Sequence, residues 1–217
     1  IMFDPAVAAK RVNLDGDVDI VKESANNYYE GVTQAEVEAY YAKMRRPDDD
    51  TPVLSGLNSK VVKENGQVVE KVYKIGGMYS GAIERIVYWL EKASTIAENE
   101  QQKAAIDNLV DYYKTGDLET FDDYSIAWLN DTTSTIDFVN GFIEVYGDPM
   151  GLKGAYESVL SVKDQEASKR MAALSQNAQW FEDRMPWTAA YRKPNVTGIV
   201  ANAIDVVVET GDSGPVT

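Results

Sequence analysis

The sequence contains neither cysteine nor histidine in its 217 residues. Cysteine and histidine are the common soft ligands of zinc, and imidazole is the usual proton shuttle near neutral pH. These residues therefore cannot complete an ordinary zinc site alone, and Ser or Thr without His forms no nucleophile–base pair. The lack of cysteine also excludes a disulfide framework, but it is compatible with either a reducing or an oxidising compartment.

Basic residues are also scarce, since 35 Asp and Glu stand against 21 Lys and Arg, which gives a formal charge of −14. This charge repels a phosphate backbone, so we expect no nucleic-acid partner. It favours a cationic ligand such as a peptide amino terminus, although general solubility also explains it. No run of about 18 consecutive apolar residues occurs, so the sequence predicts no membrane-spanning helix and no membrane partner.

The chain nevertheless has enough apolar material, 44% hydrophobic residues, for a sizeable core in one or two domains. It starts at Ile1 rather than at an initiator Met, and it ends shortly after the apolar run 199–208. We therefore expect a portion of a longer protein. Asp15–Asp19 has the alternating carboxylates of a calcium loop, but Ile20 and Asn26 replace the required Gly and Glu, so we expect no calcium site.

Four helices are predicted in the first 130 residues. Thr33 and Glu36 form a capping-box pattern that begins a helix from about Gln34 to Arg45. Apolar spacing predicts a second helix from about Ser80 to Glu98, a third that ends at Gly116, and a fourth capped by Asp117. The last three have short links and should pack as one helical layer.

Strand patterns occur on both sides of this layer. The β-branched runs around Asn65-Gly66 predict a two-residue hairpin, because this dipeptide tolerates positive φ angles. IDFVNGFIEVYG and ESVLSV predict two extended segments that pair. Asp164 should cap a helix to about Trp180, Ile199–Glu209 resembles a buried strand, and GDSGPVT resembles a turn. The fold class is α+β: a helical layer packed with a β-hairpin and a small mixed or antiparallel sheet.

The segment after Asn140 carries the candidate site. Strand alternation predicts that Phe142, Glu144 and Tyr146 share one side of a strand, with Ile143 on the other. A carboxylate beside a phenol can bind an ammonium group and donate a hydrogen bond to a developing oxyanion. The structural alternative is that Tyr146 is a half-buried aromatic with a satisfied hydroxyl and that Glu144 lies in solvent.

Asn140–Glu157, NGFIEVYGDPMGLKGAYE, resembles a hallmark segment of the dipeptidyl peptidase III family of zinc metallopeptidases. The matching pieces are GFIEVYGDPMG and GAYES. Weaker similarity extends through NNYYEGVTQAEVEAYYAKM, the hairpin, AWLND and ALSQNAQWFEDRMPW, so it covers most of Asn26–Trp187. The central motif is specific, whereas the helices between these pieces would not identify the family.

The resemblance implies a two-lobed exopeptidase that removes dipeptides from peptide amino termini, with zinc as cofactor. The family's zinc ligands come from a histidine–glutamate helix motif and a later glutamate, which this chain lacks. We therefore expect a fragment, inactive alone, that binds no metal and whose partners are an oligopeptide and the missing zinc-bearing lobe. Residues 1–163 would form part of the substrate-binding lobe, and residues 164–217 would lead towards the zinc lobe. We expect a cytoplasmic location, or a periplasmic one if the parent has a signal sequence.

Residue by residue, the resemblance gives Glu144 the role of receiving the substrate's free amino group. It gives Tyr146 the catalytic role of hydrogen-bonding the tetrahedral intermediate, and it makes Ile143 and Glu157 further substrate-binding positions. Three departures from the family pattern concern the surrounding loops. The segment TTSTID ends at Asp137, which stands in for a glutamate of the family. Lys153 occupies a position where the family more often has Arg, and Ser158 occupies one where it often has Gly.

Two other functions remain open from the sequence. The chain is alternatively a non-enzymatic peptide-binding or interaction module, because it supplies no metal site and no nucleophile–base pair. Carbohydrate binding through exposed aromatic residues is the third possibility. The spacing of the tryptophans opposes it, since helical core positions are predicted for most of Trp89, Trp128, Trp180 and Trp187.

Overall fold

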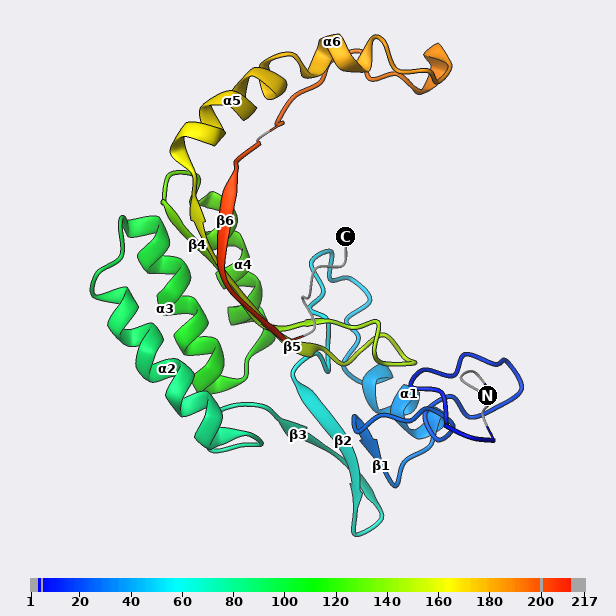
Figure 1. Cartoon of the computed structure of the whole chain (residues 1–217). Coiled ribbons are helices and arrows are strands. Elements are labelled where there is room, and N and C mark those ends of the chain that lie inside the picture. Colours follow the sequence, from blue (N-terminus) through cyan, green and yellow to red (C-terminus); the bar gives the residue numbers. More distant parts are fainter. Residues whose placement is uncertain (1–3, 5, 200, 212–217) are drawn as a thin grey trace. The chain divides into compact units, whose positions relative to one another are not determined.

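The structure is a computed structural model that describes residues 4, 6–199 and 201–211 (Figure 1). The chain divides into two compact units. Unit 1 consists of Ile1–Ser134, Asn140–Glu157 and Gly211–Thr217, as far as these are described, and unit 2 of Thr135–Val139 and Ser158–Thr210. None of the helices in the described ranges is long and apolar enough to cross a membrane. The predicted division at residue 163 concerns the lobes of a larger protein and stays a prediction.

Unit 1 contains a small mixed sheet of three strands. They are β1 (Tyr29–Glu30), β2 (Ser59–Glu64) and β3 (Gln67–Val72), in the order β1-β2-β3. The predicted hairpin is confirmed: β2 and β3 are antiparallel, and Asn65 and Gly66 both have positive φ angles, 50° and 79°. The two-residue β1 pairs parallel to β2 and had no sequence signal, because so short a strand has no periodicity.

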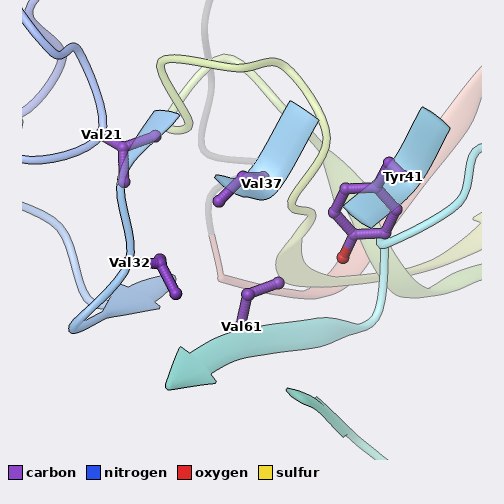
Figure 2. Close-up of a cluster of buried hydrophobic side chains, with 5 residues drawn as sticks. All are labelled: Val21, Val32, Val37, Tyr41 and Val61. Carbon is purple, nitrogen blue, oxygen red and sulfur yellow. The ribbon is translucent and has the colours of Figure 1, made fainter. Parts of the chain in front are cut away.

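The first helix, α1 (Gln34–Ala42), begins as predicted. Thr33 accepts a hydrogen bond from the Glu36 amide, and Glu36 accepts one from the Thr33 amide at 3.0 Å. The helix ends three residues earlier than expected. Figure 2 shows its two buried side chains beside Val61 of β2, in a cluster that consists of Val21, Val32, Val37, Tyr41 and Val61.

The predicted helical layer is confirmed as α2 (Ser80–Ser94), α3 (Glu100–Thr115) and α4 (Leu118–Asn130). Helix α3 packs against both α2 and α4, and the three lie side by side in Figure 1. It ends at Gly116, whose φ of 75° is the left-handed C-cap conformation, and Asp117 caps α4. The core of the layer is mainly α3 and consists of Ile83, Val87, Ala105, Ile106, Leu109, Val110, Tyr112, Tyr113, Phe121 and Tyr124.

A second sheet has the order β4 (Ile136–Glu144), β5 (Ala155–Lys163), β6 (Ile204–Gly211), so the predicted pairing of the two extended segments is confirmed. The prediction of a buried strand over 199–209 is wrong in its burial, because every residue of β6 is exposed. An apolar, β-branched run favours an extended conformation, but burial requires another layer packed on it. The predicted final turn lies mostly beyond the described residues.

The remaining helices belong to unit 2: α5 (Gln165–Gln176), α6 (Ala178–Glu182) and a 3-10 turn, η1 (Ala189–Tyr191). Asp164 caps α5 as predicted, accepting a hydrogen bond from the Ala167 amide at 2.8 Å. The single helix predicted to Trp180 is interrupted at Asn177. The core positions expected for the tryptophans are also wrong for three of them, since Trp89, Trp180 and Trp187 are 67%, 51% and 39% exposed.

Candidate functional site

The end of β4 carries the two principal candidate residues. Phe142 is buried, whereas Glu144, the last residue of the strand, is exposed. Tyr146 is 55% exposed and lies beyond the strand, in a turn that the Asp148 amide closes by donating to the Val145 carbonyl at 3.0 Å. The prediction that one strand presents all three residues is therefore wrong for Tyr146, because the turn and not strand alternation sets its direction.

The other two candidates lie on neighbouring strands of the second sheet. Ile143 is partly buried on β4, and Glu157 is buried on β5 with 5% of its surface exposed. Glu157 therefore differs from Glu144, whose carboxylate faces solvent. All four predicted site residues, Ile143, Glu144, Tyr146 and Glu157, belong to unit 1.

Aromatic side chains pack around Phe142, near this end of β4. The ring of Phe142 lies 4.8 Å from that of Tyr73 and 5.7 Å from that of Tyr156, measured between centroids. Asn140 donates to the Tyr156 hydroxyl at 3.0 Å and accepts a hydrogen bond from the Tyr113 hydroxyl. Because Tyr113 is fully buried on α3, the helical layer fixes the base of the strand that ends in Glu144.

A groove of about 550 Å³ opens beside this cluster within unit 1. Its lining is mainly apolar and includes five aromatic residues, and the exposed Arg85 adds a positive charge. Tyr79 holds a left-handed backbone conformation there, with φ 62°, which is uncommon for a bulky residue. Glu144 and Tyr146 are not among the lining residues, which include Tyr28, Tyr73, Tyr79, Arg85, Phe142 and Tyr156. The groove had no sequence signal, because its aromatic residues come from separate elements.

Two buried charged residues of the segment after Tyr146 were not foreseen as site residues. Asp148 is 4% exposed, and the side chain of Lys153 is fully buried, 3.7 Å from the Glu70 carboxylate. Burial lowers the pKa of Lys153 to about 8, although Glu70 and Asp148 oppose the shift. A charged residue in a polar loop is ordinarily expected to be solvated, so the sequence did not indicate this burial. Its only hint was that both residues lie inside Asn140–Glu157, the segment that resembles the family motif.

Metal binding requires several donor side chains that lie close together. Across residues 4, 6–199 and 201–211, no group of three or more His, Cys, Asp or Glu side chains could hold a metal ion. The carboxylates of Asp15–Asp19 form no such group either. Within these ranges the side chains therefore do not fit a zinc site.

Residues 16–215 match the family model of peptidase family M49. The chain therefore belongs to a family of peptidases, and that family is M49, the dipeptidyl peptidase III family. Among curated proteins, it is 30% identical to "Dipeptidyl peptidase 3" of Nematostella vectensis over 131 residues, which is 60% of this chain and 18% of that protein. Identity to the Rattus norvegicus protein of the same name is 26% over 186 residues, 86% of this chain and 24% of that protein.

Solved structures agree with this assignment at the level of the fold. The structure of DPP III from Caldithrix abyssi superposes with a TM-score of 0.68 and 23% identity over 86% of this chain and 34% of that chain. Dipeptidyl-peptidase III from Corallococcus sp. strain EGB gives a TM-score of 0.58 and 22% identity over 85% and 34%. The chain thus spans about a fifth of the length of the curated relatives quoted above.

Proposed function

We propose that this chain is the substrate-binding portion of a zinc-dependent, two-lobed dipeptidyl peptidase that releases dipeptides from peptide amino termini. Glu144 receives the substrate's free amino group, and Tyr146 donates a hydrogen bond to the oxyanion of the tetrahedral intermediate. Ile143 and Glu157 complete the substrate-binding surface. The chain is inactive alone, and its partners are the oligopeptide and a zinc-bearing lobe of the same polypeptide.

The observation that carries the proposal is that Glu144 and Tyr146 are both exposed at the end of β4, in a chain of this peptidase family. A carboxylate at a fixed distance from the scissile bond selects the free amine and so measures off two residues. A phenol aimed at the carbonyl oxygen stabilises the charge that develops there in the transition state. The formal charge of −14 favours approach of a cationic amino terminus.

The metal belongs to the other lobe in this proposal. Residues of that lobe would hold the zinc, which would supply Lewis-acid chemistry for peptide hydrolysis. The residues of this chain bind the amino terminus, orient the peptide and donate one hydrogen bond. The catalytic step therefore requires both lobes.

The second candidate, a peptide-binding module without catalysis, is favoured by the aromatic groove with its single arginine. Such a lining suits an aromatic or aliphatic side chain with a carboxylate nearby. This function predicts peptide binding without any dipeptide release from the full-length protein.

Replacement of Tyr146 by Phe in the full-length protein tests the catalytic proposal. We expect kcat for dipeptide release from an arylamide substrate to fall about 10- to 1000-fold, because one oxyanion donor is lost. The fold should be unaffected, since the exposed side chain keeps its ring. Steady-state kinetics and a thermal melt measure both quantities.

The matched control is Tyr88→Phe, which removes the hydroxyl of a similarly exposed tyrosine on α2, 52% against 55%. We expect this control to keep the parent's kcat. An equal kcat in Tyr146→Phe and in the parent would refute the role of Tyr146. Peptide binding without release of dipeptides by the parent would favour the non-enzymatic module.

A further inference from the structure

The turn that carries Tyr146 belongs to a longer connection between β4 and β5, residues 145–154, here called the Tyr146 loop. A loop of ten residues ordinarily runs over the surface and moves on the nanosecond to microsecond scale. Two buried charged side chains of this loop instead attach it to the rest of unit 1. They are Asp148 near its start and Lys153 near its end.

Asp148 organises the loop from within. Its Oδ2 accepts hydrogen bonds from the amides of Leu152 and Lys153 at 2.8 and 2.9 Å, and its Oδ1 accepts one from the Met150 amide at 3.2 Å. The Tyr29 hydroxyl of β1 donates a fourth at 2.8 Å. Hydrogen bonds to an ionised carboxylate are the strong ones, so Asp148 both closes the loop and fixes it to the first sheet.

Lys153 attaches the other end of the loop to three elements. Its Nζ donates to the Ser59 hydroxyl of β2 at 2.9 Å and also hydrogen-bonds the Tyr41 hydroxyl of α1. The Glu70 carboxylate of β3 lies 3.7 Å away and accepts a hydrogen bond from Tyr41 at 2.6 Å. A buried ammonium is retained only where such acceptors surround it, so the position of Lys153 is closely determined.

Two backbone contacts complete the attachment. The Gly154 amide donates to the Leu57 carbonyl at 2.7 Å, and the Gly56 carbonyl accepts from Lys153 Nζ at 3.1 Å. Gly56 has a φ of 94°, and a Cβ there would come within 2.6 Å of the Tyr41 hydroxyl and 2.9 Å of Lys153 Nζ. The segment before β2 is thus shaped to receive the lysine.

We propose that Asp148 and Lys153 are positioning residues that hold the Tyr146 loop in one conformation and thereby fix the phenol for the reaction. This inference rests on the proposed function of Tyr146. A donor accelerates a reaction only if it already lies where the charge develops, and a misplacement of about 1 Å can cost about 100-fold in rate. Hydrogen bonds within the protein engage both Asp148 oxygens and Lys153 Nζ, so each residue acts through the loop.

The test uses Asp148→Asn and Lys153→Met in the full-length protein. The first variant keeps the shape of the side chain but places an NH₂ group against donors, and the second keeps the length of the side chain without its charge. We expect amide hydrogen exchange over 150–153 to become about 10-fold faster or more. We also expect kcat to fall about 10- to 100-fold with KM changed less than about threefold, because Tyr146 acts chiefly in the transition state.

Asp107→Asn is the matched control. Asp107 accepts hydrogen bonds from Ser94 and Lys103 within the helical layer, so this variant weakens another charged network in unit 1. It should leave both kcat and exchange over 150–153 unchanged. If Lys153→Met does not fold, as judged by circular dichroism, Glu70→Gln removes the same ion pair with little change in shape and should have the same two effects.

The outcomes separate this inference from the proposed function. Suppose that Tyr146→Phe lowers kcat, but that Asp148→Asn and Lys153→Met (or Glu70→Gln) keep the parent's kcat and amide exchange rate. This result would overturn the positioning role and leave the proposed function of Tyr146 intact. A loss of kcat no larger than that of Asp107→Asn, at equal loss of thermal stability, would also overturn it. Parental kcat in Tyr146→Phe would overturn both.

Discussion

Units 1 and 2 differ in what lies at their centre. All the buried hydrophobic side chains found among the described residues, such as Leu109, Tyr112 and Val61, belong to unit 1. The buried residues of unit 2 in the same ranges are Ser161 and Ser168, which are polar. Unit 2 instead exposes large apolar side chains, namely Ile136, Leu174, Trp180, Phe181, Trp187, Tyr191, Ile199, Ile204, Val206, Val207 and Val208.

This difference shows that a segment can form a helix or strand without contributing to an apolar core. Helix α5 has a proper N-cap at Asp164, and β6 pairs in a sheet, yet neither buries an apolar face. Most of the stability of a helix or strand comes from such burial rather than from local propensity. Unit 1 therefore supplies a packed support for Glu144 and Tyr146, whereas the described residues of unit 2 form no comparable apolar core.

The largest expected effect is on the free energy of unfolding. It compares a leucine on a helix of unit 1 with a leucine on a helix of unit 2. Leu109 of α3 is fully buried, and Leu174 of α5 is 48% exposed. Leu109→Ala should lower the free energy of unfolding by about 2–5 kcal/mol through lost burial and the cavity left behind. Leu174→Ala should lower it by less than about 1 kcal/mol. Urea unfolding of both variants measures this, and equal losses would break the comparison.

A smaller effect concerns pH and the buried lysine of unit 1. Burial lowers the pKa of Lys153 to about 8, below its ordinary value of 10.5, so the unfolded chain binds more protons between these values. The stability of the parent should therefore rise with pH from about 8 by roughly 2 kcal/mol before about pH 10. Lys153→Met should lose this rise.

Above about pH 10 the sign reverses, because burial raises the pKa values of Tyr29 and Tyr41 well above the ordinary range. Their hydroxyls stay protonated in the folded state while the unfolded chain ionises, so stability falls again. Urea midpoints from pH 7 to 10 for the parent and for Lys153→Met measure the difference. Parallel curves for the two proteins would show that Lys153 titrates normally.

The smallest effect compares the two helix caps. Thr33 caps α1 in unit 1, and Asp164 caps α5 in unit 2. Each substitution by Ala should destabilise its helix by about 1 kcal/mol. Because α1 belongs to the core of unit 1, Thr33→Ala should shift the global unfolding transition, whereas Asp164→Ala should speed amide exchange only within α5. A shift of the main transition by Asp164→Ala would mean that the units unfold together.

The sequence predicted those helices, strands and turns whose starts and ends depend on neighbouring residues. The capping box at Thr33, the Asn65-Gly66 turn, the Gly116 C-cap and the helical layer all follow from short-range stereochemistry and periodicity. The pairing of β4 with β5 was also predicted, since two extended segments joined by a turn tend to pair. The four proposed site residues came from the motif, and their roles stay predictions.

Burial was predicted less well than secondary structure. Apolar spacing on a helix or strand shows which face could be buried, but not whether another layer reaches it, as Trp89, Trp180 and β6 show. The turn at Tyr146 also escaped the alternation argument, because hydrogen bonds of its own loop end the strand at Glu144. The aromatic groove could not be predicted, because its residues are far apart in the chain.

The amino-acid sequence by itself determined the family, the α+β class and the local starts and stops of most helices and strands, because these depend on motifs and on neighbouring residues. Only the tertiary structure decided which charged residues are buried. Lys153, Asp148 and Glu70 come from a loop and a distant strand, and they become one network only when the Tyr146 loop packs against α1 and the hairpin. The free energy of burying a charge depends on such distant partners, and no local pattern records them.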